Sequence, residues 1–267
     1  MKLRLHTVPD VPLEAEAISP VALAGLSAAE AARKTALHGN REVALGEFFE
    51  IEGSWDGTLR LEGDLSRVKL IGAGMSEGTV LIDGDVGSHL GAEMTGGEIR
   101  VEGNAADWVG REMSGGRIVI QGSAGHLVGA ATRGSAVGIR GGEILIHGNA
   151  RNELGNGMRR GLIAVGGDSG DFTGVNMLAG TIIVLGRLGA RPGAGMKRGT
   201  IVSMNEAELL PTFTYACVFE PVFLRLYMLH LRALGLPIEE AQARGRYRRW
   251  SGDSVELNRG EILLLER

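Results

Sequence analysis

A glycine-led repeat is the feature of this sequence that most constrains its fold. With the first glycine of each copy taken as offset zero, the same phrase recurs every 19 residues, and an insertion at residues 130–138 stretches one interval to 26. A less regular copy starts at Gly57, and the regular copies start at Gly78, Gly97, Gly116, Gly142, Gly161, Gly180 and Gly199. Such a period is typical of a solenoid, in which each repeat forms one coil and contacts only its neighbours.

The pattern inside each repeat indicates a β-strand. Offsets two and four carry apolar, mostly β-branched residues, such as Val80 and Ile82, and glycine returns at offsets six and thirteen. Alternation of this kind is a strand signal, whereas glycine at this density would cost about 1 kcal/mol per site in a helix. Five of the nine methionines stand at offset sixteen, so we expect them to fill the interior. The sequence therefore predicts an all-β fold, a right-handed parallel β-helix solenoid with about 19 residues per coil.

Three segments are predicted along the chain. Residues 1–56 form an N-terminal cap, in which a capping box from Ser27 to Glu30 opens a short helix that we expect to reach about Leu37. Residues 57–205 form the glycine-rich β-helix. Residues 206–267 form a C-terminal extension with one predicted helix over residues 221–234, and they carry seven of the twelve aromatic residues. We expect this apolar extension to pack on the array or on another subunit.

Composition excludes several function classes. The chain has 267 residues and a net charge of −4, which gives no reason to expect a nucleic-acid partner. No apolar run approaches the length that crosses a membrane, and the first residues lack the apolar stretch of a signal peptide. A single cysteine, Cys217, allows no internal disulfide. Together these features predict a cytoplasmic protein without a membrane partner.

A search for catalytic chemistry finds no candidate. The six histidines stand at different offsets, so the sequence predicts no metal site and no catalytic residue. A polar column at offset seven is the possible exception, and its members are Asp64, Asp85, Asn104, Ser123, Asn149 and Asp168. We interpret it mainly as a ladder of turn-forming side chains that bind backbone amides. The alternative is that Asp64 and Asp85 form the acid pair of a retaining glycosidase.

Two further columns suggest binding surfaces. Offsets seventeen and eighteen of the later copies carry Arg133, Arg159, Arg160, Lys197 and Arg198, which equal offsets would bring to one edge. This predicted basic strip is either a solvated edge or a site for an anionic ligand or an acidic partner. At offset three the early copies have Arg60 and Arg100, but later copies form an apolar stripe of Val119, Leu145, Ala164, Ile183 and Val202. Either the C-terminal helix or a partner must cover this stripe, and we expect it to face catalytic subunits.

These motifs resemble a known family. The phrase G-x-I-x-V-x-G with G-x-x-M, and its closing copy at residues 193–202, are similar to the C subunit of formylmethanofuran dehydrogenase, which is related to the C-terminal β-helix domain of the glutamate synthase large subunit. Residues 37–49 resemble the family's entry segment. Residues 211–215 and 247–252 resemble the bacterial branch, which belongs to the formyltransferase/hydrolase complex of methylotrophs.

The resemblance implies a subunit that works inside an assembly. Such an assembly contains a formyltransferase subunit, a metal-dependent amidohydrolase subunit and further subunits. It moves a formyl group from formyl-tetrahydromethanopterin to a methanofuran-type carrier and releases formate. No catalytic residue carries over to this chain, which predicts a non-catalytic scaffold without a cofactor of its own. The carrier's glutamate-rich tail is then a candidate ligand for the basic strip. The alternatives are a glutamate synthase-like accessory domain and, with less support, a carbohydrate-active β-helix enzyme.

Overall fold

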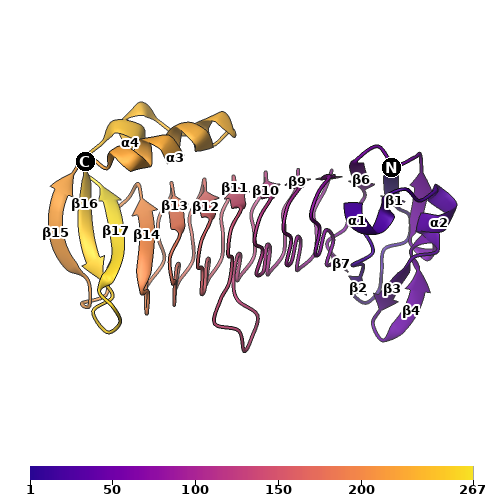
Figure 1. The fold of residues 1–267 in the computed structure, drawn as a ribbon, viewed down its shortest axis with the longest axis horizontal. Coiled ribbons are helices and arrows are strands. Elements are labelled where there is room, and N and C mark those ends of the chain that lie inside the picture. The colour runs from indigo at the N-terminus through magenta and orange to yellow at the C-terminus, as the bar shows by residue number, and fades with distance from the viewer. Residues whose placement is uncertain (267) are drawn as a thin grey trace.

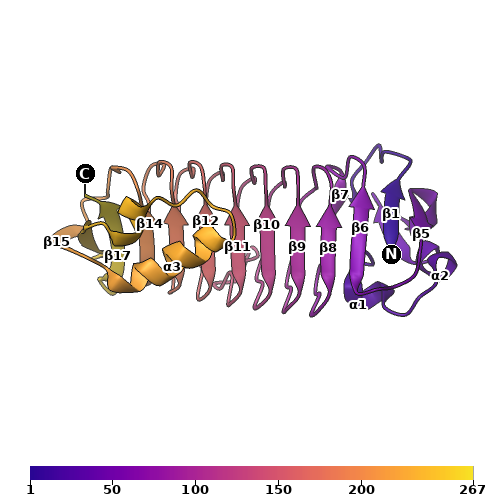
Figure 2. The same cartoon turned by 90° about the horizontal axis from the view of Figure 1, so that it is seen from above.

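A long parallel sheet dominates the computed structural model, which describes residues 1–266 (Figures 1 and 2). Each repeat contributes one strand, and each strand pairs in parallel with the equivalent strand of the next repeat. These strands are β6 (Thr58–Glu62), β8 (Thr79–Ile82), β9 (Glu98–Val101), β10 (Arg117–Ile120), β11 (Glu143–Ile146), β12 (Leu162–Val165), β13 (Thr181–Val184) and β14 (Arg198–Ser203). Offsets one to four of the regular repeats therefore form strands, as the alternation predicts.

A second ladder shows that whole repeats stack on one another. Isolated parallel bridges join the offset-eight residues of successive copies, from Leu65 through Val86 and onward to Leu188. The chain thus returns to this second ladder once per repeat, and the strands of successive repeats lie side by side in Figure 2. A mostly β chain built on a long parallel sheet is consistent with the predicted solenoid.

Apolar columns fill the space between the two ladders. The side chains at offsets two and four are buried in every regular repeat, and the methionines at offset sixteen are buried as well. Glycine is required where the coil turns inward beside this core. At Gly110, φ is +61° and a Cβ atom would lie 2.5 Å from the Ile144 Cδ1 atom. A side chain there would be both strained and overpacked.

The N-terminal residues extend the sheet and cap its end. Strand β1 (Lys2–Leu5) pairs in parallel with β6 and antiparallel with β5 (Phe49–Glu52). A smaller sheet has the order β4 (Arg41–Ala44), β3 (Thr35–His38), β2 (Leu13–Glu14) and β7 (Val68–Lys69). Helix α1 covers Pro20–Leu23, helix α2 covers Ala28–Ala32, and a 3₁₀ turn covers Leu45–Glu47.

The predicted capping box is present, but its helix is shorter than expected. The Ser27 hydroxyl accepts a hydrogen bond from the Glu30 backbone amide, and the Glu30 carboxylate accepts one from the Ser27 amide. Helix α2 ends at Ala32, so the expectation that it reaches Leu37 is wrong. Residues 35–38 instead pair with residues 41–44 as a hairpin, because tertiary pairing outweighs the helix preference of this alanine-rich segment.

The C-terminal residues add three strands and two helices, where the sequence predicted one helix. Strand β17 (Arg259–Leu265) pairs in parallel with β14, and β16 (Tyr247–Gly252) and β15 (Thr214–Phe219) continue the sheet in antiparallel pairs. Helices α3 (Val222–Ala233) and α4 (Glu240–Arg244) lie beside the last coils (Figures 1 and 2). The division at residues 56 and 205 stays a prediction, and the sheet itself continues across both positions.

Helix α3 covers the apolar stripe. Leu224, Met228 and Leu231 point toward the sheet and are buried in one cluster with the stripe residues Val119, Leu145, Ala164, Ile183 and Val202. Of the two proposed covers, the helix is therefore the one present, and the expectation that the stripe itself faces catalytic subunits is wrong. Within residues 1–266, no helix combines the length and the apolar character needed to cross a membrane.

Candidate functional site

Four residues of the basic strip line a depression on the C-terminal half of the array. The depression holds about 500 Å³, and its lining consists of Arg159, Arg160, Leu178, Ala179, Gly180, Lys197, Arg198 and Leu257. Each basic pair directly follows a buried methionine, Met158 or Met196. Because the chain turns outward after the methionine, both pairs are exposed on the same edge.

Coil stacking sets the distance between the two pairs. One coil lies between them, and it carries Leu178 and Ala179 at the same offsets. The pairs are thus about two strand spacings apart, on the order of 10 Å. An anionic chain laid across the coils can meet both pairs without the pairs crowding each other.

Most of this positive charge has no acidic partner. Lys197 Nζ lies 3.8 Å from a Glu256 carboxylate oxygen, whereas Arg159, Arg160 and Arg198 form no ion pair within residues 1–266. Arg133 lies in the insertion between β10 and β11, which projects from the array in Figure 1, and it is not among the lining residues. The structure therefore brings together four of the five predicted residues.

A second depression adjoins the first, between α3 and the turns before β11 and β12. It holds about 820 Å³ and is lined by Gly142, Glu143, Arg160, Gly161, Leu162, Phe223, Leu226, Tyr227 and His230. Arg160 lines both depressions, so the two lie on either side of this residue. Glu143 accepts a hydrogen bond from Arg117 Nε at 3.0 Å and lies 2.9 Å from His230 Nε2. The sequence could not reveal this surface, because it exists only when α3 is docked.

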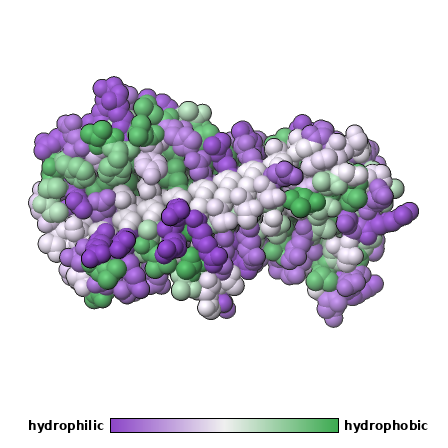
Figure 3. Space-filling model, in the orientation of Figure 1, coloured by the Kyte–Doolittle hydropathy of each residue, from purple (hydrophilic) through white to green (hydrophobic). Residues whose placement is uncertain are grey.

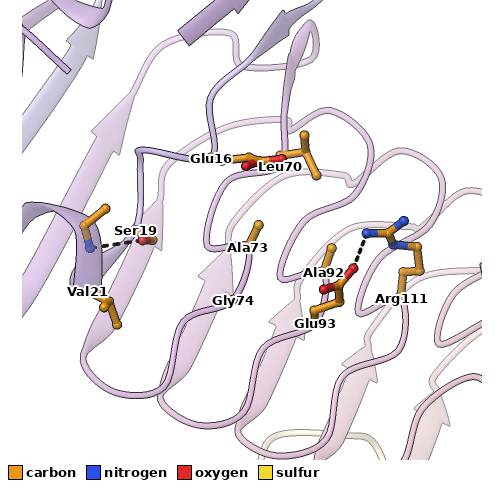
Figure 4. Close-up of a pocket in the computed structure, with 10 residues that line it drawn as sticks. Glu16, Ser19, Val21, Leu70, Ala73, Gly74, Ala92, Glu93 and Arg111 are labelled. Carbon is orange, nitrogen blue, oxygen red and sulfur yellow. Dashed lines mark hydrogen bonds and ion pairs between the residues drawn. The ribbon is translucent and has the colours of Figure 1, made fainter. Parts of the chain in front are cut away.

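A third depression lies at the other end, between α1 and the coil wall. Figure 4 shows its lining, which includes Glu16, Ser19, Glu93 and Arg111, and it holds about 370 Å³. Arg111 Nη2 donates to a Glu93 carboxylate oxygen at 2.7 Å. These two opposite charges offset each other and leave the Glu16 carboxylate as the remaining charge of the lining, so this depression suits an anionic ligand less than the basic one does.

The offset-seven column is a hydrogen-bonded ladder. Five of its six members accept a bond from the backbone amide one coil further on: Asp85 from Asn104 at 2.7 Å, Asn104 from Ser123 at 2.8 Å, Ser123 from Asn149 at 3.0 Å, Asn149 from Asp168 at 2.8 Å, and Asp168 from Arg187 at 2.7 Å. The amide of Arg187 holds the pKa of Asp168 below its usual value. Asp64 accepts from Ser66, which likewise lowers its pKa. These contacts agree with the turn-forming interpretation.

Sequence reasoning missed a second ladder at offset ten. His126 donates its backbone amide to Asp107 at 2.7 Å, Asp171 donates to Asn152 at 3.1 Å, and Ala190 donates to Asp171 at 2.8 Å. The signal was present, because polar residues share that offset in four copies: Asp107, His126, Asn152 and Asp171. The side chains of this ladder also accept bonds from backbone amides, so they help to hold successive coils together.

The histidines do not converge on a metal site. Within residues 1–266, no group of three His, Cys, Asp or Glu side chains could hold a metal ion. His38 and His230 each lie 2.9 Å from one carboxylate, of Asp10 and Glu143. Burial lowers the pKa of both His89 and His147, which favours their neutral forms.

Comparison with known proteins identifies the family. The GXGXG motif model matches residues 57–217, more than half of the chain. The C subunit of molybdenum-containing formylmethanofuran dehydrogenase 1 of Methanothermobacter wolfeii is 47% identical over 82 residues, 30% of this chain and 20% of that protein. A chain in the X-ray crystal structure of the formyltransferase/hydrolase complex (FhcABCD) from Methylorubrum extorquens in complex with methylofuran matches over 100% of both chains, with 37% identity and a TM-score of 0.93. The chain belongs to the family of formylmethanofuran dehydrogenase C subunits.

Membership of this family confirms the resemblance predicted from the repeat. The C subunit of the formyltransferase/hydrolase complex Fhc of Methylorubrum extorquens is 40% identical over 73 residues, 27% of this chain and 28% of that protein. The alignments thus span only 20% to 28% of these curated relatives, whereas the structural match spans the whole chain. The basic depression lies mostly inside the segment matched by the GXGXG model, and helix α3 lies beyond it.

Proposed function

We propose that this chain is a non-catalytic scaffold subunit of a formyltransferase/hydrolase complex. The observation that carries the proposal is the match over the full length to a chain of FhcABCD. The side-chain geometry supports it, because the polar columns most able to supply acid pairs are used to bind backbone amides. In this proposal the coils form a right-handed parallel β-helix, the hand found in nearly all crossovers between parallel strands.

The partners and the reaction follow from the family. A formyltransferase subunit, an amidohydrolase-type subunit and further subunits would assemble on this chain in the cytoplasm. Together they would pass a formyl group from formyl-tetrahydromethanopterin to a methanofuran-type carrier and release formate. The scaffold would bind no cofactor of its own and would hold the catalytic subunits at a fixed separation, since its coils form one continuous sheet.

Purification of the tagged chain from its native host tests the proposal. We expect formyltransferase and amidohydrolase subunits to copurify, with activity present in the assembly and absent from the chain alone. Copurification with glutamate synthase subunits would contradict the proposal. Carbohydrate hydrolysis by the chain alone would contradict it as well.

The basic strip is proposed to bind the carrier's acidic tail. Arg159, Arg160 and Arg198 are exposed and lack acidic partners within residues 1–266, which supports an anionic ligand. Charge-assisted bonds to such a ligand are stronger than neutral ones. Arg133 lies apart from the depression, so we expect it to contribute less than the other four residues.

Charge reversal tests the strip. Arg159→Glu combined with Arg198→Glu should raise the apparent KM for the carrier by about tenfold, equal to the loss of about 1.4 kcal/mol of binding, and neither residue lines the second depression. Arg151→Glu is the control, because Arg151 is exposed in the same coil but does not line the depression. An unchanged KM in the double variant, with the complex still assembled, would exclude the strip as the carrier's site.

A further inference from the structure

Helix α3 is apolar on two faces, and its own chain covers only one of them. Its inner face is buried against the sheet, as described above. On its outer face Val222 is 79% exposed, Leu226 is 74% exposed and Leu229 is 43% exposed. An apolar helix face is normally buried against another surface.

The exposed residues form one stripe. Val222, Leu226 and Leu229 are spaced four and three residues apart, which aligns them along the helix. In Figure 3, which has the orientation of Figure 1, hydrophobic residues gather at the C-terminal end of the molecule, over α3 and α4. A contiguous apolar surface of this kind marks an interaction site.

The stripe continues into the second depression. Leu226 belongs to both, and Phe223 and Tyr227 extend the apolar wall from the helix toward Arg160 on the coil edge. A ridge on the helix and a hollow of about 820 Å³ beside it therefore form one surface. A ridge beside a hollow is better suited to binding a polypeptide segment than to forming a flat contact.

The open charge on this surface is positive. Arg160 and Arg225 form no ion pair within residues 1–266. The acid on the same wall, Glu143, is already paired with Arg117 and lies within hydrogen-bond distance of His230. An occupant that is apolar and also carries carboxylates would match this surface in both respects.

We propose that the outer face of α3 and the adjoining depression bind an apolar, carboxylate-bearing segment of a partner subunit. This inference rests on the proposed function. It places partner binding on the outer face of α3, because the apolar stripe on the sheet is covered by that helix and is not accessible to a partner. A second copy of this chain fits less well. A twofold contact through the same patch would bring Arg225 and Arg160 toward their own equivalents.

The test uses the full chain and the other subunits of the formyltransferase/hydrolase-type complex from the same organism, purified together as the binding probe. Leu226→Asp and Val222→Asp should each weaken assembly by about 30-fold or more, as expected for a central interface anchor. Val8→Asp is the matched control, because Val8 is 60% exposed but lies between β1 and β2 in the N-terminal part of the chain. Val222 begins α3, where an aspartate favours the helix, so that variant should fold. Arg225→Glu should weaken assembly most at low salt.

The outcomes separate the two proposals. If the unaltered chain does not bind the other subunits, the proposed function fails. If the unaltered chain binds and both aspartate variants bind equally well, with unchanged thermal melts, only the inference about α3 is overturned. Light scattering that shows a dimer of the isolated chain, dissociated by Leu226→Asp, would assign the surface to a second copy and would also overturn it.

Discussion

The packing of α3 on the sheet can be tested by substitutions on its buried and exposed faces. Met228 is fully buried between the helix and the sheet, whereas Leu226, two residues earlier, is mostly exposed. Replacing each by alanine deletes a side chain of similar size from the same helix. The two variants differ in which face loses its contacts, so Leu226→Ala is the control for Met228→Ala.

The expected magnitudes follow from burial. Met228→Ala removes three heavy atoms beyond Cβ, worth about 2.4 kcal/mol at about 0.8 kcal/mol each. A partly filled cavity adds to this loss, so we expect about 3 kcal/mol, within the range known for such changes. Leu226→Ala removes atoms that already contact water, and we expect a change below about 0.5 kcal/mol.

Hydrogen exchange of the α3 backbone amides measures this directly. If the helix opens locally, a loss of about 3 kcal/mol speeds exchange of these amides by about 100-fold. Met228→Ala should show that increase and Leu226→Ala should not. Equal exchange rates in the two variants would refute the reasoning, because α3 would then not rest on the sheet through Leu224, Met228 and Leu231.

Three further predictions concern the coils. Asn149→Ala removes the acceptor of the Asp168 amide and should cost about 1 kcal/mol in urea unfolding, whereas Asn149→Asp keeps an acceptor and should cost less. Asp168 has a pKa lowered in the folded state, so its contribution is present above its unfolded value of about 3.9 and is lost as pH falls through the lower folded pKa. Asp168→Asn should therefore flatten the acid side of the stability curve, and an unchanged slope would argue against the ladder contact. Gly110→Ala should cost about 2 kcal/mol more than Gly74→Ala, because both positions have positive φ but a Cβ atom meets neighbours only at Gly110. Equal thermal melts of the two glycine variants would contradict this packing.

The regular coils were predictable because the signal repeats. Each copy places apolar residues at offsets two and four, and one wrong register would expose all of them at once. The methionine column was predictable for the same reason, and each of its members is buried. Four cations of the basic strip share a depression because equal offsets stack. Arg133 does not join them because it lies inside the insertion, which takes the chain out of the repeat register.

The ends were harder because their structure depends on tertiary contacts. Residues 35–38 look helical in isolation, yet they pair across a hairpin turn at Gly39. Strands β15, β16 and β17 lack the repeat phrase and are defined by the sheet that they extend. The sequence did not decide whether the C-terminal helix or a partner covers the apolar stripe. The packing of α3 on the sheet decides this in the structure, and it also forms the depression beside the helix.

Partner contacts are expected over α3 and the depression beside it, and carrier contacts over the basic depression, whereas the polar ladders serve the fold. Hydrogen exchange of this chain, free and in the assembled complex, tests that division most directly. On assembly we expect added protection at residues 222–233 and little change along the turns that hold Asn104 and Asn149. Added protection around residues 159–160 and 197–198 is expected only when the carrier is present. Protection confined to those turns, with α3 unchanged on assembly, would contradict it.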